Sequence, residues 1–462
     1  MKLHITELGA IKEGNVDLSK KMNVFCGPNG TGKTYMAYVI YGLLKNQIHV
    51  GTNDDLVKEL IDKKKVIYNI DFDVLDYYRE DLISNLKGDF DGLFGIGEDL
   101  AKKYFNETNI SFIETPEEFK NSLIKSVFKT SLTIRKSKIE VSKIKDTQFI
   151  EIEILDKTIS NDEVNNLNFF LYSAIISLLG SYPIGSTYIL PVERNSIFTF
   201  SKELSISKQE AVDHFHAMTS KNKTDRFELI FSKTTRYPLP IKDGLMIADD
   251  LAETKKNISK FNEFANEIEN ELLHGKVLIT NEGELQFIPD KANKKSLPIH
   301  MTASIIKSLS SLVIYLKHIA QKNDLIIIDE PEINLHPDNQ IILTRLFARL
   351  INHEFRLIIS THSDYIVREI NNLIMLSQKQ PEVQKLKELY NYKNDEFINK
   401  EDIEVNFFDF PKRKTSNKQV ILEKLIISNS GFEIPSVDKT IEDQNNISEE
   451  LFVAIKYGKI NE

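Results

Sequence analysis

Residues 325 to 337 read Leu-Ile-Ile-Ile-Asp-Glu-Pro-Glu-Ile-Asn-Leu-His-Pro. Four consecutive apolar residues followed by two adjacent carboxylates and a proline predict a buried strand that carries Asp329 and Glu330 to the edge of a sheet. Carboxylates in that position need a cation or a reacting water beside them. The stretch therefore predicts a site for a cation or a reacting water at the edge of a sheet, in a protein of the α/β class.

A second stretch, far upstream, supplies the partner that these carboxylates imply. It consists of Gly27, Pro28, Asn29, Gly30, Thr31, Gly32, Lys33 and Thr34, and it fits the pattern G-x-x-x-x-G-K-[ST]. The loop follows a short apolar strand at 23–26 and opens a predicted helix over 33–44, so backbone N–H groups and the positive helix end would cradle phosphates while Lys33 reaches the outer oxygens. A chance match is the alternative, and the strand-loop-helix setting disfavours it. Together the two stretches predict a nucleoside triphosphatase site.

Composition limits what else the chain can be. With 462 residues, of which 41% are apolar, two to four domains with sizeable cores are expected. The N-terminus does not resemble a secretory signal, and no run of about 18 uncharged apolar residues occurs, which predicts a cytoplasmic protein without a membrane partner. One cysteine, Cys26, fits a reducing compartment. The net charge of −9 disfavours constitutive wrapping of nucleic acid but leaves a local basic surface open.

Two further strand ends carry candidate residues. The apolar strand at 186–195 ends in Glu193 and Arg194, and Arg194 is either a phosphate or interface contact or a partner in a surface ion pair. His362 ends the apolar strand that begins at residue 356, and this strand is expected beside the Asp329 strand. His362 is then either a structural histidine or a group that faces the γ-phosphate and polarises the attacking water.

A predicted helix over residues 305–320 precedes the carboxylate strand, and hydroxyl side chains gather at its start. Thr302 and Ser304 are either N-caps or groups that present a hydroxyl and free N–H donors to a triphosphate. Roughly 300 positions separate Lys33 from Asp329, much more than one αβ unit needs, whereas the hydroxyl-headed helix, acidic strand and histidine strand follow closely. This is the order of ABC-type ATPases.

On these motifs the chain resembles the ABC ATPase heads of the SMC and OLD group. The resemblance implies that 27–34 is the Walker A loop, 326–330 is Walker B with Glu330 as its catalytic residue, 334–337 is the D-loop, and His362 is the switch histidine. Ser304 lies where the family has its signature serine, although no Leu-Ser-Gly-Gly motif occurs and no Q-loop glutamine can be placed. Within the group, the segments Leu190-Pro-Val-Glu-Arg194 and Ser360-Thr-His-Ser-Asp-Tyr365 are most similar to bacterial anti-phage ATPases of the PtuA type, from Septu and retron-Septu systems.

The resemblance also implies an architecture. The expected fold is an ABC-type P-loop ATPase head with a mixed parallel sheet, an antiparallel β-subdomain and a helical insertion. The expected divisions are an N-terminal half at 1–200 with an accessory helical region at 48–130, an insertion at 201–275, a C-terminal half at 276–375 and a strand and helix tail at 376–462.

Function and partners follow as expectations of the same resemblance. ATP and Mg²⁺ are the expected ligands: Thr34 and Asp329 would hold Mg²⁺, Glu330 would activate water, and Ser304 would serve the ATP of a second protomer. The expected partners are a second head, higher oligomers and a separate effector such as an HNH-type nuclease, and nucleic acid stays open. The alternatives are an SMC- or RecF-like DNA-repair ATPase that clamps DNA, and an OLD-like nuclease. The last ranks lowest, because carboxylates after His362, such as Glu404 and Asp409, are scattered.

Overall fold

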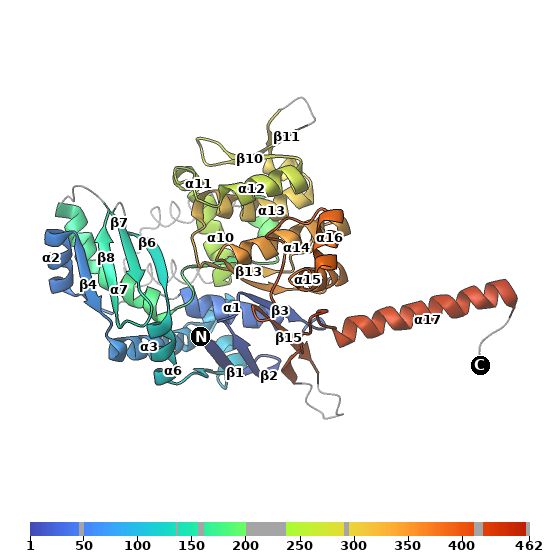
Figure 1. Ribbon diagram of the computed structural model, residues 1–462, viewed down its shortest axis with the longest axis horizontal. Coiled ribbons are helices and arrows are strands. Elements are labelled where there is room, and N and C mark those ends of the chain that lie inside the picture. Colours follow the sequence, from blue (N-terminus) through green and yellow to red (C-terminus); the bar gives the residue numbers. More distant parts are fainter. Residues whose placement is uncertain are drawn as a thin grey trace, which may run out of the picture.

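The computed structural model describes residues 1–45, 50–134, 137–155, 161–199, 237–290, 295–410 and 419–458. Within these ranges the main feature is a nine-stranded mixed sheet with strand order β5-β1-β2-β16-β15-β3-β14-β13-β9 (Figure 1). Its strands are β1 Lys2–Leu8, β2 Ile11–Asp17, β3 Met22–Cys26, β5 Asn109–Phe112, β9 Thr187–Leu190, β13 Leu325–Asp329, β14 Arg356–Ser360, β15 Ile403–Asp409 and β16 Val420–Lys424.

The five strands β15-β3-β14-β13-β9 run parallel and form the centre of the sheet. Strands β3 and β13 are buried along their whole length, as expected where helices cover both faces of a sheet. In the register of the sheet, Asp329 lies beside Ser360, and Ser360 lies beside Phe25. The segments that follow β3, β14 and β13 therefore leave the sheet at one edge. The prediction that the histidine strand lies beside the Asp329 strand is confirmed.

Successive residues of β13 enter two different cores. Leu325 and Ile327 belong to a cluster with α1 (Lys33–Lys45) and the helices that follow it, α3 (Phe72–Gly88) and α7 (Asn161–Gly180). Ile326 and Ile328 belong to a second cluster with the C-terminal helices. These are α13 Ser304–Ile314, which continues as a π-helix η3 Tyr315–Ile319, and α14 Pro337–Asn352 and α15 Asp364–Met375. Because side chains alternate between the two faces of a strand, the two faces of this sheet pack against two different helical layers.

Two smaller antiparallel sheets flank the centre. The first has the order β4-β8-β7-β6, with β4 Lys65–Asn69, β6 Phe128–Ile134, β7 Ser137–Lys143 and β8 Phe149–Ile154, and it packs against α2 (Asp54–Lys63) and α7. The second has the order β10-β11-β12, with β10 Gly275–Ile279, β11 Leu285–Pro289 and β12 Leu297–Pro298. With these sheets, the predicted α/β P-loop fold with a mixed sheet and an antiparallel β-subdomain is confirmed.

Glu13 and Gly14 lie inside β2, and the chain turns at residues 9–10. A side chain at Gly14 would put its Cβ 2.7 Å from Leu422 Cδ2, because β16 pairs with β2 at this point. This glycine therefore serves a close approach between strands, not a turn.

The strands at 403–424, which were expected in a C-terminal tail, lie in the main sheet. β15 pairs with β3, β16 pairs with β2, and the two strands together join β2 to β3 within the sheet. Beyond them, α17 (Pro435–Tyr457) projects away from the body of the molecule, as Figure 1 shows at the right. The residues after 376 thus complete the sheet before they form a protruding helix.

The predicted insertion at 201–275 is described only from residue 237 onward; the earlier part lies outside the described residues. Its helices are α10 Leu239–Asp249, α11 Leu251–Thr254, α12 Asn262–Glu267 and the π-helix η1 Ile268–Leu273. The segment from Leu251 to Leu272 is therefore divided among three helices. Ser259 docks on the end of η3, where its N–H donates to Lys317 O at 2.8 Å and its Oγ to Ala320 O at 2.9 Å, and this contact interrupts the helix.

The region 48–130 contains more than the predicted helices and loops. Its helices are α2, α3, α4 Phe90–Phe94, α5 Glu98–Phe105 and α6 Pro116–Lys125, and its strands β4 and β5 join two different sheets. Thr115 caps α6, and Glu118 completes a capping box. This region thus links the main sheet to the four-stranded sheet.

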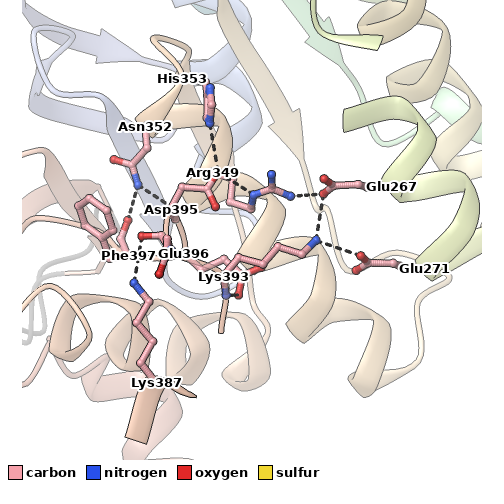
Figure 2. A network of polar contacts seen from close by, with 11 residues as sticks. Glu267, Glu271, Arg349, Asn352, His353, Lys387, Lys393, Asp395, Glu396 and Phe397 are labelled. Carbon is pink, nitrogen blue, oxygen red and sulfur yellow. Dashed lines mark hydrogen bonds and ion pairs between the residues drawn. The ribbon is translucent and has the colours of Figure 1, made fainter. Parts of the chain in front are cut away.

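A network of ion pairs joins the C-terminal helical layer to the segment after α16 (Pro381–Leu389) (Figure 2). Arg349 of α14 pairs with Glu267, and its Nε donates to Asp395 Oδ2 at 2.9 Å. Lys393 Nζ lies 3.2 Å from Glu267 Oε2 and 3.0 Å from Glu271 Oε1. These contacts fix α12 and η1 against α14, the helix that begins after the carboxylate strand.

Among the described residues, no helix has the length and apolar character needed to cross a bilayer.

Candidate functional site

The loop between β3 and α1 wraps around its own lysine. Lys33 Nζ donates to the carbonyl oxygens of Gly27 at 3.0 Å and Pro28 at 2.9 Å. Lys33 is buried, and burial lowers its pKa, while the negative charges of Asp329 and Glu330 oppose that shift. A phosphate placed in the loop would offer this ammonium a stronger partner than two carbonyl groups.

Close packing explains the first glycine of the loop. Gly27 has φ +133°, and a Cβ there would lie 2.1 Å from the backbone oxygen of Phe408 in β15. Thr31 Oγ1 donates to Pro28 O at 2.8 Å, and the loop tip at Asn29 and Gly30 is exposed. Because α1 begins directly after Gly32, its first N–H groups and its positive end face this loop. The loop therefore has the donors that an anionic phosphate needs.

One hydrogen bond joins the loop to the carboxylate strand across 295 positions of sequence: Thr34 Oγ1 donates to Asp329 Oδ2 at 2.8 Å. Asp329 is buried, and its Oδ1 accepts from the hydroxyl of Ser360. A hydroxyl and a carboxylate beside a phosphate loop are hard oxygen donors of the kind that Mg²⁺ prefers. The donor set thus fits the metal that the sequence implied.

Glu330 follows with an unusual backbone conformation. Its φ is +47°, in the left-handed region, and its N–H donates to Ser360 O at 3.0 Å. Burial raises the pKa of Glu330, and the adjacent charge of Asp329 raises it further, while Lys33 and Arg194 oppose both effects. A carboxylate with a raised pKa is suited to accept a proton from water.

His362 lies at the same edge, two residues beyond the end of β14. Its side chain is exposed. Desolvation lowers its pKa, the charge of Lys33 lowers it further, and Asp329 opposes the shift. This direction favours the neutral ring. The backbone N–H of His362 donates to Glu332 Oε1 at 2.7 Å, which ties this residue to the loop after β13.

The sequence reading did not single out Glu332, although it belongs to the quoted stretch. Its carboxylate accepts from Thr361 Oγ1 at 3.0 Å and from the His362 N–H at 2.7 Å. Burial raises the pKa of Glu332, and the hydrogen bond from His362 opposes that shift. Glu332 therefore ties the loop after β13 to the residue pair that ends in His362. The feature of the sequence that could have indicated Glu332 is its carboxylate, two positions after Glu330.

Ser304 is the first residue of α13 and is exposed. The alternative that Thr302 or Ser304 caps this helix is wrong, because the N-cap position belongs to Ala303 and Thr302 Oγ1 donates back to Ile299 O at 2.6 Å. The start of α13 therefore presents its N–H groups without a side-chain cap. One turn further on, Ser308 Oγ accepts from Asn334 Nδ2 at 3.0 Å, which links α13 to the loop after β13.

Arg194 is not a partner in a surface ion pair. Its side chain is buried, and its guanidinium donates to the backbone oxygens of Asp329 and Glu330, each at 2.7 Å. Burial lowers its pKa to about 10, against the attraction of neighbouring carboxylates, so the group stays charged at neutral pH. The expected contact with phosphate is thus replaced by a contact with the backbone that carries the two carboxylates.

The structure thus gathers Lys33, Thr34, Asp329, Glu330 and His362 at one edge of the sheet. Ser304 lies at the exposed start of α13, and no hydrogen bond joins it to the phosphate loop among the residues that the structure describes. No role was predicted for Ser360 from the sequence, although it lies two positions before His362. The register that pairs Ser360 with Asp329 was the missing information.

A parallel α/β sheet with this loop and acidic strand end defines a P-loop ATPase fold. The sequence model of the family described as AAA ATPase domain matches residues 1–367 of the 462. The chain belongs to this family. No curated protein sequence matches it.

Similar solved structures are heads of Smc proteins. An Smc head bound to the C-terminal winged-helix domain of ScpA has 12% identity and a TM-score of 0.33, with 92% of this chain and 97% of that chain covered. An Smc head with an extended coiled coil, bound to the C-terminal domain of ScpA from Pyrococcus furiosus, has 12% identity and a TM-score of 0.32, covering 97% and 98%. The SMC head from Thermotoga maritima has 9% identity and a TM-score of 0.30, covering 92% and 98%. The family assignment rests on the sequence match.

Proposed function

We propose that this protein is an ABC-type ATPase that hydrolyses ATP between two heads and acts as a nucleotide-dependent switch for a separate effector. The observation that carries the ATPase part is the 2.8 Å hydrogen bond from Thr34 Oγ1 to Asp329 Oδ2. It brings the hydroxyl of a phosphate loop to the end of an acidic strand, with Glu330 as the next residue. The family match supports nucleotide binding at this loop.

Each residue has a role in the proposed reaction. Lys33 and the loop N–H groups hold the outer phosphates, and Thr34 and Asp329 hold Mg²⁺. Once bound with ATP, Mg²⁺ supplies charge neutralisation at the phosphate oxygens. Glu330 accepts a proton from the attacking water, whose oxygen forms a bond to the γ-phosphorus as the bond to the ADP oxygen breaks. The neutral ring of His362 accepts or donates one hydrogen bond at the same edge.

Two variants test this mechanism. Glu330→Gln should keep ATP binding and lose turnover by about a hundredfold or more, as expected for a positioned acid-base group. Lys33→Ala should lose ATP binding itself, because the ammonium contacts the phosphates in ground state and transition state alike. Nucleotide binding and phosphate release are measured for both proteins.

Glu354→Gln is the matched control for Glu330→Gln. Glu354 also has a left-handed φ, of +70°, but it pairs with Lys322 at the opposite end of the sheet, just before β14 begins. This variant should hydrolyse ATP at the wild-type rate. Normal turnover by Glu330→Gln would remove Glu330 as the proposed base.

The shared site rests on the uncapped start of α13. Because α13 presents free N–H groups and the Ser304 hydroxyl at an exposed position, it can close the γ-phosphate of a second head. In mixtures of Lys33→Ala and Ser304→Arg protomers, each mixed dimer keeps one intact composite site. Partial ATPase activity should therefore return on mixing, and no recovery in verified mixed dimers would count against a shared site.

The switch part of the proposal concerns α17. Ile447, Leu451 and Ile455 recur every fourth residue, lie on one face of this helix, and are 50%, 59% and 86% exposed. We propose that an effector protein, of the kind that anti-phage ATPases regulate, covers this face. ATP then controls the effector because one head arrangement binds it better than the other.

Co-purification with the product of the neighbouring reading frame tests the docking face. Leu451→Glu combined with Ile455→Glu should abolish it, whereas Asn445→Glu, an exposed position on the opposite side of α17, should leave it unchanged. Nuclease assays on the isolated protein with plasmid, single-stranded DNA and RNA provide the second test. Cleavage by this protein alone, lost in Glu404→Ala or Asp409→Ala while ATPase activity persists, would replace the switch with a self-contained nuclease.

A further inference from the structure

Arg194 has a side chain that contacts backbone atoms at the candidate site. Its side chain is 2% exposed. Nη1 donates to Asp329 O at 2.7 Å and to Pro191 O at 3.0 Å, and Nη2 donates to Glu330 O at 2.7 Å. A planar guanidinium can satisfy two adjacent carbonyl groups with a fixed relative orientation, which a point-like ammonium cannot. The contact therefore constrains direction as well as distance.

Arg194 contacts Asp329 at a point where the neighbouring strand β9 has ended. β9 pairs with β13 only as far as Leu190 beside Ile328. Pro191, the residue after β9, lies opposite Asp329, and the chain turns at residues 192 and 193, so the strand does not continue along β13. The Arg194 side chain, three residues after Pro191, supplies a donor at this point. The carbonyl of Asp329 is thus paired by a side chain where the neighbouring strand has ended.

The backbone that Arg194 holds is the one with the unusual conformation. A left-handed φ costs a non-glycine residue about 1 kcal/mol or more, so surrounding contacts must maintain it. At Glu330, the N–H is held by Ser360 O at 3.0 Å and the carbonyl by Arg194 at 2.7 Å. The peptide groups on both sides of Glu330 are therefore anchored, and the direction of its side chain follows from those anchors.

We infer that Arg194 is a positioning residue for ATP hydrolysis, which fixes the peptide groups of Asp329 and Glu330 so that Glu330 faces the attacking water. The inference rests on the proposed function and deepens it. Arg194 acts through Glu330, because its guanidinium donates to the backbone carbonyls of Asp329 and Glu330. Substitution of Arg194 therefore reduces the turnover number. ATP affinity stays close to wild type, because it depends on the phosphate loop, which Arg194 does not contact.

The chain offers a matched control in Arg356. Its guanidinium also donates to backbone carbonyls, those of Ser19 at 2.7 Å, Lys20 at 3.0 Å and Pro183 at 3.3 Å. Arg356 is the first residue of β14, so it lies at the opposite end of the parallel sheet from Asp329. Arg194→Lys and Arg356→Lys remove the same kind of contact, one beside the site and one remote from it.

The experiment measures ATP affinity, turnover number and melting temperature for wild type and both variants. Arg194→Lys should reduce turnover by about a hundredfold, the expected result of displacing a reacting group by about 1 Å, with ATP affinity within about threefold of wild type. Arg356→Lys should keep wild-type turnover at a comparable loss of melting temperature. If Arg194→Lys does not fold, Arg194→Gln, whose amide can still donate to one carbonyl, takes its place with the same expectation.

Three results would overturn the inference. Turnover of the Arg194 variant within about threefold of wild type would show that the contact does not position Glu330. An equal loss of turnover in Arg356→Lys would show a general structural role. A loss of ATP affinity as large as the loss of turnover would show that Arg194 shapes the whole site. A wild-type protein that binds ATP without hydrolysing it would instead reject the proposed function, and this result is read before either variant is compared.

Discussion

Glu332 provides a sharp test of the loop after β13, because charge and hydrogen bonding can be separated there. Its Oε1 accepts from both donors, with Thr361 Oγ1 at 3.0 Å and the His362 N–H at 2.7 Å, and its Oε2 also lies 3.0 Å from Thr361 Oγ1. Glu332→Gln keeps Oε1 and removes the charge. Glu332→Ala removes the oxygen as well.

The magnitudes follow from the burial of the two donors. Thr361 is fully buried, so loss of its acceptor should cost about 1 to 3 kcal/mol, whereas water can reach the exposed His362, and the loss there is about 1 kcal/mol. Glu332→Ala should therefore lower the free energy of unfolding by about 2 to 4 kcal/mol. Glu332→Gln should change it by no more than about 1 kcal/mol, because both hydrogen bonds persist and a buried charge is removed.

Activity should follow geometry. Without its backbone anchor His362 shifts, and Glu332→Ala should lose turnover by about tenfold to a hundredfold, while Glu332→Gln keeps about a third or more. Urea unfolding and steady-state phosphate release measure the two effects. Glu396 supplies controls: it is buried, accepts from the Lys393 N–H at 2.9 Å, and belongs to the network in Figure 2, remote from the loop. Glu396→Ala should lose stability and keep turnover. If Glu332→Gln is as inactive as Glu332→Ala while it stays folded, the carboxylate charge itself takes part in the chemistry and the anchoring argument fails.

Two further predictions concern stability. Asp324 is buried and accepts from the Tyr315 hydroxyl at 2.7 Å, and burial raises its pKa from 3.8 to about 6. The folded protein then holds this proton more tightly than the unfolded chain, so the free energy of unfolding should fall by about 3 kcal/mol as pH rises from about 4 to 7; Asp324→Asn should remove this dependence, and an unchanged pH profile would contradict it. Gly14→Ala places a Cβ 2.7 Å from Leu422 Cδ2 and should destabilise by about 1 to 3 kcal/mol, which Leu422→Ala in the same protein should partly reverse. Chemical unfolding of the single and double variants checks this, and additive losses would rule out the contact as the cause.

Short-range patterns in the sequence were enough to predict the parts of the site that neighbouring residues make by themselves. The glycine loop, the strand before it and α1 after it follow one another within 24 positions from Met22 to Lys45, so turn chemistry and helix signals identify them without knowledge of the fold. The same holds for the apolar run that delivers Asp329. In each case the physical cause is local, namely side-chain periodicity, glycine conformation and helix-end electrostatics.

Only the tertiary structure decided which strand ends meet and what holds them. β15 and β16 enter the sheet next to strands some 380 or more positions earlier, and no local pattern distinguishes such strands from a separate tail. Arg194 was predicted to be a phosphate or interface contact or a partner in a surface ion pair, but its partners are backbone oxygens 135 and 136 positions away. The reason for a glycine at position 14 likewise depends on its packing against Leu422. Such contacts arise from strand pairing and close packing between distant segments, and a sequence read in order carries no signal of the register that creates them.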